Sequence, residues 1–235
     1  QTKQNVSDRV HKAFTNFFRR VKEHSKEKGF PRFKSRVNSI TFPQSGFKML
    51  SERRLRLSKI GSVPIVLHRI PKGKIKTLTI KVNKANQWFV YFCCEIQNVR
   101  TVHPSKEKIG IDVGIENFAT LSNGETIANP HFLIKAEHRL KRLQRRLSRK
   151  VRGSANRRKA RFRLAKQHLK VTNQRTDFLH KLSRSLVIRF STIAVEELDV
   201  KSMLKNHWLA KSITDASWNQ FIQMLSYKEV ALGGQ

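Results

Sequence analysis

The stretch that most constrains the fold is residues 108–124, where one carboxylate interrupts an apolar run. Residues 109–113 form a run of strand length that carries a single acid, Asp112, and Gly114 follows two residues later. Residues 118–121 have the composition of a second short strand, which ends at the turn Asn123-Gly124. The pattern predicts a strand, a turn and a second strand, with an acid inside the unit.

Asp112 is the residue of this unit that points to chemistry. A carboxylate on an otherwise apolar strand loses hydration, so it requires a metal ion, a cation or a set of hydrogen bonds. Gly114 has no side chain, so backbone or a phosphate could approach closely beside Asp112. The alternative is an edge-strand aspartate that faces water, and this stretch alone does not decide between the two.

A second acid ends a strand-like segment far downstream. Residues 193–195 form a strand core that includes two β-branched residues, and Glu196 lies where that strand ends. A long helical segment separates the two strands, and such a crossover suits strands that pair in parallel. Parallel pairing would bring Asp112 and Glu196 together. Carboxylates from neighbouring strands are ligands for Mg²⁺ or Mn²⁺, so the pair predicts a site for one or two divalent ions.

The segment between the two acids is basic and has a helical pattern. Gly153-Ser154 interrupts the apolar residues of segment 130–189, which predicts two helices in a hairpin, the first with a seam of Leu140, Leu143, Leu147 and Val151. Between His138 and Thr176 there are sixteen Lys or Arg and no Asp or Glu. Such charges repel one another unless phosphates neutralise them, with a solvated basic face as the alternative. The candidates for nucleic-acid contact are Arg145, Arg146, Arg149, Arg152, Arg157, Arg158, Arg161 and Arg163.

The N-terminal part predicts one helix and several short strands. Residues 6–26 have apolar residues at helical spacing, and Phe14, Phe17 and Phe18 are expected to pack in a core rather than to stack on bases. After the break at residues 29–35, short strands with turns between them suggest a small β-barrel or sandwich. These strands are expected at residues 40–42, 55–57, 63–67, 75–82 and 87–96.

The amino-acid composition limits the kinds of partner that the chain is expected to bind. Lys and Arg total 49 against 16 acids, a net charge of +33, which indicates nucleic acid as the partner and says nothing about the fold. No apolar run reaches the roughly 18 residues of a membrane span and no signal-peptide pattern opens the chain, so we expect a cytoplasmic protein without a membrane partner. The two cysteines, Cys93 and Cys94, are adjacent in a strand-like segment and would point to opposite faces, so we expect reduced packing residues.

These motifs resemble a known family. Residues 110–115 with Phe118-Ala119, then residues 195–201, 209–213 and 215–218, are similar in order and type to TnpB, the OrfB-type probable transposases of insertion sequences. The resemblance implies an RNA-guided DNA endonuclease related to the type V CRISPR effectors. It also implies a mixed α/β fold with an RNase H-like, RuvC-type nuclease domain, in which Asp112 and Glu196 are the first two catalytic acids and bind Mg²⁺ or Mn²⁺. The partners would be a guide RNA and a target DNA, whose heteroduplex the arginines of the hairpin would follow.

The resemblance further divides the chain. Residues 1–28 would be the last helix of a recognition lobe, 29–103 an oligonucleotide-binding-like wedge barrel, and 104–235 an incomplete nuclease domain. Arg32 and Lys34 match the family's motif at the entrance to the wedge, where such residues contact guide RNA, although they could simply solubilise a loop. The family's upstream segment would be missing before Gln1. In the family pattern, a zinc ribbon and a third catalytic acid would follow after Gln235. Thr214 or Asp215 is expected to cap a helix that starts near Trp218, so Asp215 is better explained as a cap than as a third metal ligand.

Three functions are therefore compared. The first is a TnpB-type RNA-guided DNA nuclease. The second is a family member that binds RNA and DNA without cutting, which the absence of a third acid would favour. The third is a basic RNA-binding protein in which Asp112 and Glu196 have no role. The sequence does not identify the guide RNA, the target-adjacent motif or the oligomeric state.

Overall fold

The computed structural model describes residues 2–33, 37–96, 103, 105–196 and 198–233. By its internal contacts the chain divides into two compact units, residues 1–98 and 99–235. Both α-helices and β-sheets contribute, so the mixed α/β class expected from the sequence is observed. Each unit is described by itself below.

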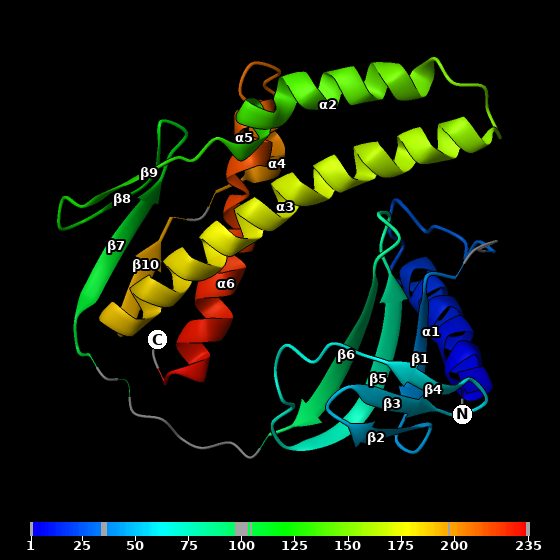
Figure 1. Cartoon of the computed structure of the whole chain (residues 1–235). Coiled ribbons are helices and arrows are strands. Elements are labelled where there is room, and N and C mark those ends of the chain that lie inside the picture. The colour runs from blue at the N-terminus through cyan, green and yellow to red at the C-terminus, as the bar shows by residue number, and fades with distance from the viewer. Residues whose placement is uncertain (1, 34–36, 97–102, 104, 197, 234–235) are drawn as a thin grey trace. The chain divides into compact units, whose positions relative to one another are not determined.

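In its described residues, the first unit comprises one helix and two three-stranded antiparallel sheets. One sheet has the order β1-β5-β6 and the other the order β2-β3-β4. A shared core, centred on Phe42, Leu55 and Leu78, joins the two sheets. The elements are α1 (Thr2–Lys22), β1 (Ser39–Pro43), β2 (Phe47–Ser51), β3 (Arg54–Leu57), β4 (Gly61–Pro64), β5 (Lys74–Val82) and β6 (Trp88–Glu95), shown in Figure 1.

The first unit differs from the sequence prediction in several details, among them that β4 ends at Pro64 rather than at the predicted residue 67. Strand β2 was not expected, because its five residues, Phe47–Ser51, are few and Leu50 next to Met49 interrupts the alternation of apolar and polar residues. Helix α1 ends at Lys22, before the predicted residue 26, and none of its side chains whose burial is described is fully buried. Phe14 and Phe18 are 36% and 60% exposed and pack with Phe17 and Phe30 in a surface cluster, so the prediction that they lie in a core is wrong.

The second unit is built on a four-stranded mixed sheet with the order β10-β7-β8-β9. Strands β7, β8 and β9 form an antiparallel meander, and β10 adds to the other edge of β7 in parallel. The predicted turn at Asn123-Gly124 is present, because Gly124 has φ 89° and its amide donates to the Leu121 carbonyl, and it leads into β9, a strand that was not predicted. The strands are β7 (Lys108–Val113), β8 (Asn117–Leu121), β9 (Thr126–Ala128) and β10 (Thr192–Val195).

Two long helices connect β9 to β10 and form the predicted hairpin (Figure 1). They are α2 (Phe132–Ser148) and α3 (Ala155–Arg189), and Ser154 caps α3 by accepting a hydrogen bond from the Arg157 amide (3.1 Å). Val151 is 76% exposed in the loop between them, so it does not belong to the apolar seam predicted for α2. Although α3 has 35 residues, no helix in the described part of the chain is long and apolar enough to cross a membrane.

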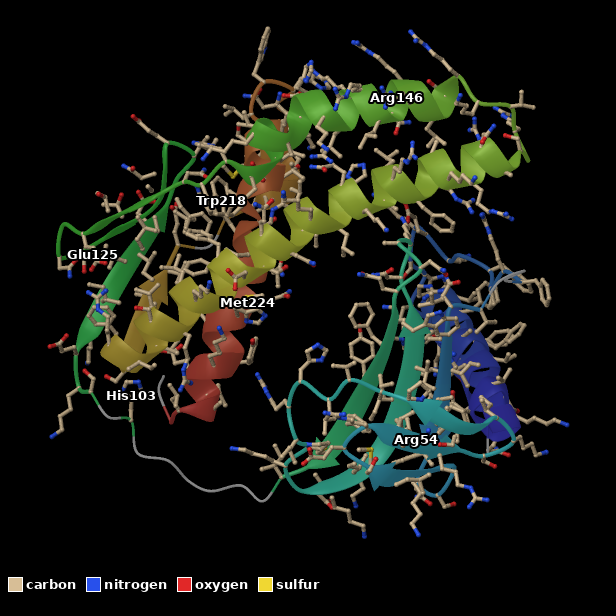
Figure 2. The ribbon with its side chains drawn as sticks, viewed as in Figure 1. Arg54, His103, Glu125, Arg146, Trp218 and Met224 are labelled. Carbon is tan, nitrogen blue, oxygen red and sulfur yellow. The ribbon has the colours of Figure 1, made fainter. Side chains whose placement is uncertain are left out.

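The main core of the second unit lies on one face of its sheet. The C-terminal half of α3 supplies Leu179, Leu186 and Val187, and α6 (Trp218–Ala231) supplies Trp218 and Phe221. Figure 2 shows Trp218 and Met224 on α6 where it packs against α3. The N-terminal half of α3 forms a separate small core with α2. Two shorter helices, α4 (Val200–Met203) and α5 (Ala210–Ala216), lead into α6.

Candidate nucleic-acid and metal site

The pairing of β7 with β10 sets the position of the two acids. Val195 of β10 is paired with Ile111 of β7 in a parallel register, as the sequence predicted. The paired residues end at Val195, and the same register continued for one residue would set Glu196 beside Asp112. Because neighbouring strands lie about 4.8 Å apart, the two acids would then occupy adjacent backbone positions at the C-terminal ends of adjacent strands.

Asp112 and Glu196 belong to the sheet face opposite the core. Ile109, Ile111 and Val113 are buried against α3 and α6, and Ile193 and Val195 pack on the same core. Side chains alternate along a strand, so Asp112 points the other way, and both Asp112 and Glu196 are exposed. Among the described residues neither carboxylate makes a hydrogen bond or ion pair with another side chain. The oxygens of both acids are therefore open to a ligand.

The geometry revises three sequence-based arguments about Asp112 and its neighbour Gly114. Asp112 is exposed, so burial does not force a partner on it. The alternative of an edge-strand aspartate that faces water is correct in the exposure of Asp112 and wrong about the edge, because β7 lies between β10 and β8. Gly114 is explained by the turn rather than by an approaching phosphate: its amide donates to the Phe118 carbonyl (3.2 Å), and a Cβ at Gly114 would lie 2.9 Å from the Asn117 carbonyl oxygen.

Several contacts hold β10 in register against the rest of the unit. The Ser191 amide donates to the Glu107 carbonyl (2.8 Å) just before the two strands pair. On β10 itself, the Ile193 amide donates to Glu229 Oε1 of α6 (3.2 Å). Burial raises the pKa of Glu229, a shift that the hydrogen bond from Ile193 and the charge of His103 partly oppose. Helix α6 thus fixes the strand that precedes Glu196.

Helix α3 is tied to the same framework at its C-terminal half. Arg189 forms a two-point ion pair with Glu125 at the β8–β9 turn (2.6 and 3.1 Å), and the hydrogen bond from Arg189 lowers the pKa of Glu125. Lys228 of α6 donates to the His180 carbonyl (2.8 Å) and to Ser183 Oγ (2.6 Å), and burial lowers the pKa of Lys228. Sheet, α3 and α6 therefore form one connected support for the two acids.

Asp215 and Asp199 are used in helix caps. Asp215 is 5% exposed; Oδ1 accepts from Arg175 of α3 (2.8 Å) and Oδ2 accepts from the Leu133 amide at the start of α2 (2.9 Å). The sequence-based prediction placed this cap on the helix that begins at Trp218, but Asp215 lies in α5 and caps α2. Asp199 accepts from the Ser202 amide and caps α4. Glu197 and Lys34 lie outside the described residues.

The donors present fit a single divalent ion. Mg²⁺ is commonly held by one or two carboxylates together with substrate phosphates and water, and Asp112 and Glu196 supply two such carboxylates. In the part of the chain that the structure describes, no group of three or more His, Cys, Asp or Glu is placed to hold a metal. A metal at this position would thus depend on phosphate or on further ligands for its remaining contacts.

The α2–α3 hairpin carries the arginines predicted to contact nucleic acid. Seven of the eight are exposed, and Figure 2 shows Arg146 projecting from α2. Arg157 differs, because its guanidinium donates to the carbonyls of Leu147 (3.1 Å) and Lys150 (2.8 Å) and so closes the C-terminal end of α2. Arg32 of the first unit is exposed. The hairpin thus presents a basic surface, while Arg157 holds its tip together.

Comparison with known proteins places the chain in a family. Residues 91–207, about half of the chain, match the OrfB family of IS605, described as "Probable transposase". The chain is 38% identical over 221 residues to a "Putative RNA-guided DNA endonuclease" of Streptomyces pristinaespiralis, covering 92% of this chain and 53% of that protein. It is 32% identical over 244 residues to "Putative RNA-guided DNA endonuclease InsQ" of Escherichia coli K12, covering 96% of this chain and 59% of that protein.

A more distant relative has a related name. "TnpB-like protein L79" of Acanthamoeba polyphaga mimivirus is 27% identical over 166 residues, covering 65% of this chain and 32% of that protein. The chain spans about half the length of the curated relatives it matches. The match to the family and the similarity to the two endonuclease relatives together include β7, β10 and the basic hairpin. The chain belongs to the TnpB, or OrfB-type, family of insertion-sequence proteins.

Proposed function

We propose that the chain is part of an RNA-guided DNA endonuclease and that its second unit is a RuvC-type, RNase H-like nuclease domain. Asp112 and Glu196 hold a divalent ion, Mg²⁺ or Mn²⁺, beside the scissile phosphate. Residues 29–103 serve as a wedge-like barrel, α1 as the last helix of a recognition lobe, and residues 104–235 as the nuclease part. The localisation that follows from this function is the cytoplasm, with the protein associated with the nucleoid when it is bound to DNA.

The parallel register of β7 and β10 is the observation that carries this proposal. Extended by one residue, it would set the exposed Asp112 and Glu196 side by side, on strands whose other face packs against α3 and α6. A bound divalent ion would supply activation of water and stabilisation of the leaving oxygen. The protein's own contribution is to hold Asp112 and Glu196 at a fixed separation, with β10 anchored through the Glu229 contact to Ile193.

The basic hairpin supplies the binding surface in this proposal. From His138 to Thr176 the chain has sixteen Lys or Arg and no acid, and seven of the eight predicted arginines are exposed. Arginines on helices neutralise backbone phosphates without reading bases. Sequence specificity would then come from pairing between guide RNA and target strand, with the protein recognising backbone and shape.

The test is to purify the chain with its bound RNA, sequence that RNA, and offer a DNA duplex complementary to a segment of it. We expect scission of this duplex, and not of an unrelated duplex, in Mn²⁺ or Mg²⁺. Asp112→Asn abolishes the scission, while Glu116→Gln, an exposed acid in the β7–β8 turn, leaves it unchanged. Scission that is independent of the RNA, or that persists in Asp112→Asn, contradicts the proposal.

A second candidate function is guided binding without cutting, and one observation favours it. Glu197, Asp199 and Asp215 are the candidates for a third ligand, and the two of them that the structure describes, Asp199 and Asp215, are engaged in helix caps. Two carboxylates alone hold a second ion weakly. RNA-dependent binding of the complementary duplex with no scission in either metal would support this function, and the absence of both binding and scission would contradict both candidates.

A further inference from the structure

The outer face of the β1-β5-β6 sheet has an arrangement that folding does not explain. Phe42, Leu78 and Phe92 point inward to the core shared with the other sheet. Their neighbours along each strand therefore form the outer face. The register places these neighbours in two cross-strand rows, Ser39–Lys81–Phe89 and Thr41–Thr79–Tyr91.

Two aromatic rings lie open on this face. Phe89 is 40% exposed and Tyr91 is 52% exposed, and their ring centroids are 6.4 Å apart with the planes tilted by 43°. Folding gains little from rings left in water, whereas an eight-residue strand pair holds these two rigidly at spacing i, i+2. Exposed aromatics on a sheet are the usual platform on which proteins stack unpaired bases, because every base has a π-face.

The surroundings of the two rings suit a polyanion with hydroxyl groups. Lys81 lies directly across from Phe89, and Arg9 of α1 reaches the same row by donating to the Ser39 hydroxyl (3.3 Å). Glu95, further along β6, is paired with Lys76 (2.7 Å). In the next row the hydroxyls of Thr41 and Thr79 are 3.0 Å apart, so one donates to the other and the pair retains one further donor and free lone pairs.

We propose that this face binds single-stranded RNA, with two consecutive bases stacked on Phe89 and Tyr91. Lys81 and Arg9 lie near the phosphates, and the Thr41–Thr79 pair offers hydrogen bonds to a ribose 2′-hydroxyl, the group that distinguishes RNA from DNA. The site is separate from Asp112 and Glu196, and it goes beyond the proposed function by assigning a second RNA contact to the first unit. The test measures RNA binding and not DNA cleavage, so a failure of this proposal would leave the nuclease proposal intact.

The experiment measures the affinity of the chain for a fluorescent oligouridylate by anisotropy at high ionic strength, where phosphate contacts contribute least. Phe89→Ile and Tyr91→Ile remove a ring but keep an apolar residue that favours strands. Each is expected to weaken binding by roughly 5- to 150-fold, while affinity for duplex RNA is unchanged because paired bases do not stack on protein rings. Tyr91→Trp retains a ring and is expected to restore binding.

The matched control is Tyr227→Leu, because Tyr227 of α6 is 53% exposed, nearly the same as Tyr91, but lies in the other unit. It is expected to bind oligouridylate like the unchanged chain. The corresponding deoxyoligonucleotide is expected to bind more weakly than the RNA, with the difference reduced in Thr79→Val. Three results would overturn the proposal. They are an equal loss of affinity for duplex and single-stranded RNA in the ring variants, a loss in Tyr227→Leu as large as that in Tyr91→Ile, and equal affinity of the chain for RNA and DNA.

Discussion

Asp215→Ala is expected to destabilise the second unit strongly. The Asp215 side chain is 3% exposed and that of Arg175 is 17% exposed, with 2.8 Å between the charged atoms. Removing the carboxylate leaves a buried guanidinium without its partner, and Arg175 Nε is already buried without a hydrogen bond among the described atoms. Breaking a buried pair in this way costs about 3–5 kcal/mol. Asp215→Ala also removes the hydrogen-bond acceptor of the Leu133 amide. Because the two interactions share one side chain, their free energies are not added.

The assay is urea unfolding followed by the fluorescence of Trp218, which is 2% exposed in the core of this unit. Trp88 and Trp208, the other two tryptophans, are replaced by Phe in all variants so that the signal reports on the second unit alone. Asp177→Ala is the matched control: its ion pair with Lys181 is equally short at 2.7 Å, but its side chain is 62% exposed, so the change is expected to cost at most about 1 kcal/mol.

A loss below about 1 kcal/mol for Asp215→Ala would refute this account of the residue. Such a result would mean that the contacts of Asp215 with Arg175 and with the start of α2 do not stabilise the fold. Asp215 would then be available as a third metal ligand. The double variant Asp215→Ala with Arg175→Met is expected to recover much of the lost stability, because it removes both charges together. If the double variant is less stable than Asp215→Ala by the full free energy that Arg175→Met costs on its own, the two residues act independently.

The remaining predictions concern pH, salt and the hairpin. Burial raises the pKa of Glu229, so the folded state binds a proton more readily than the unfolded state, and stability falls as the pH rises above the usual carboxyl pKa of 4.5. Glu229→Gln removes this ionisation, so it should raise the Tm in circular dichroism melts at neutral pH but not at a pH below 4.5. If the chain contacts about 6–10 phosphates, its affinity for a duplex should fall by roughly 10³–10⁵ between 50 and 200 mM salt, and a flat response in filter binding would contradict the electrostatic account. Arg158→Ala should reduce the salt slope by about one, whereas Arg157→Ala should chiefly lower thermal stability, because Arg157 closes the end of α2.

The sequence predicted the parts of this structure that depend on local pattern. The strand with Asp112, the strand before Glu196, the turn at Gly124 and the helical hairpin all have apolar spacing or turn residues that mark them. Parallel pairing of β7 and β10 followed from the long crossover between them. The family resemblance rested on the segments around Asp112 and Glu196 together with residues 209–213 and 215–218, and the comparisons confirm it.

What the sequence did not reveal depends on contacts between distant residues. Asp215 caps α2, which begins more than eighty residues earlier, and no local rule predicts this. Arg157 has the same residue type as its neighbours, yet it bonds backbone carbonyls. The exposure of Asp112 and of Tyr91 depends on which face of each sheet the helices and the second sheet cover, although the alternation of Phe89 and Tyr91 was a signal that could have been noticed. The assignment of catalytic roles to Asp112 and Glu196 stays a prediction.

The most direct test of the central claim is a double-mutant cycle on metal affinity. Mn²⁺ binding to the chain is titrated for the unchanged protein, Asp112→Asn, Glu196→Gln and the double variant, with Glu116→Gln as the control. If both carboxylates hold one ion, each single change weakens Mn²⁺ binding about tenfold or more, and the second change adds little to the first. Unchanged affinity in either single variant, or losses that simply add, would show that Asp112 and Glu196 do not form one site.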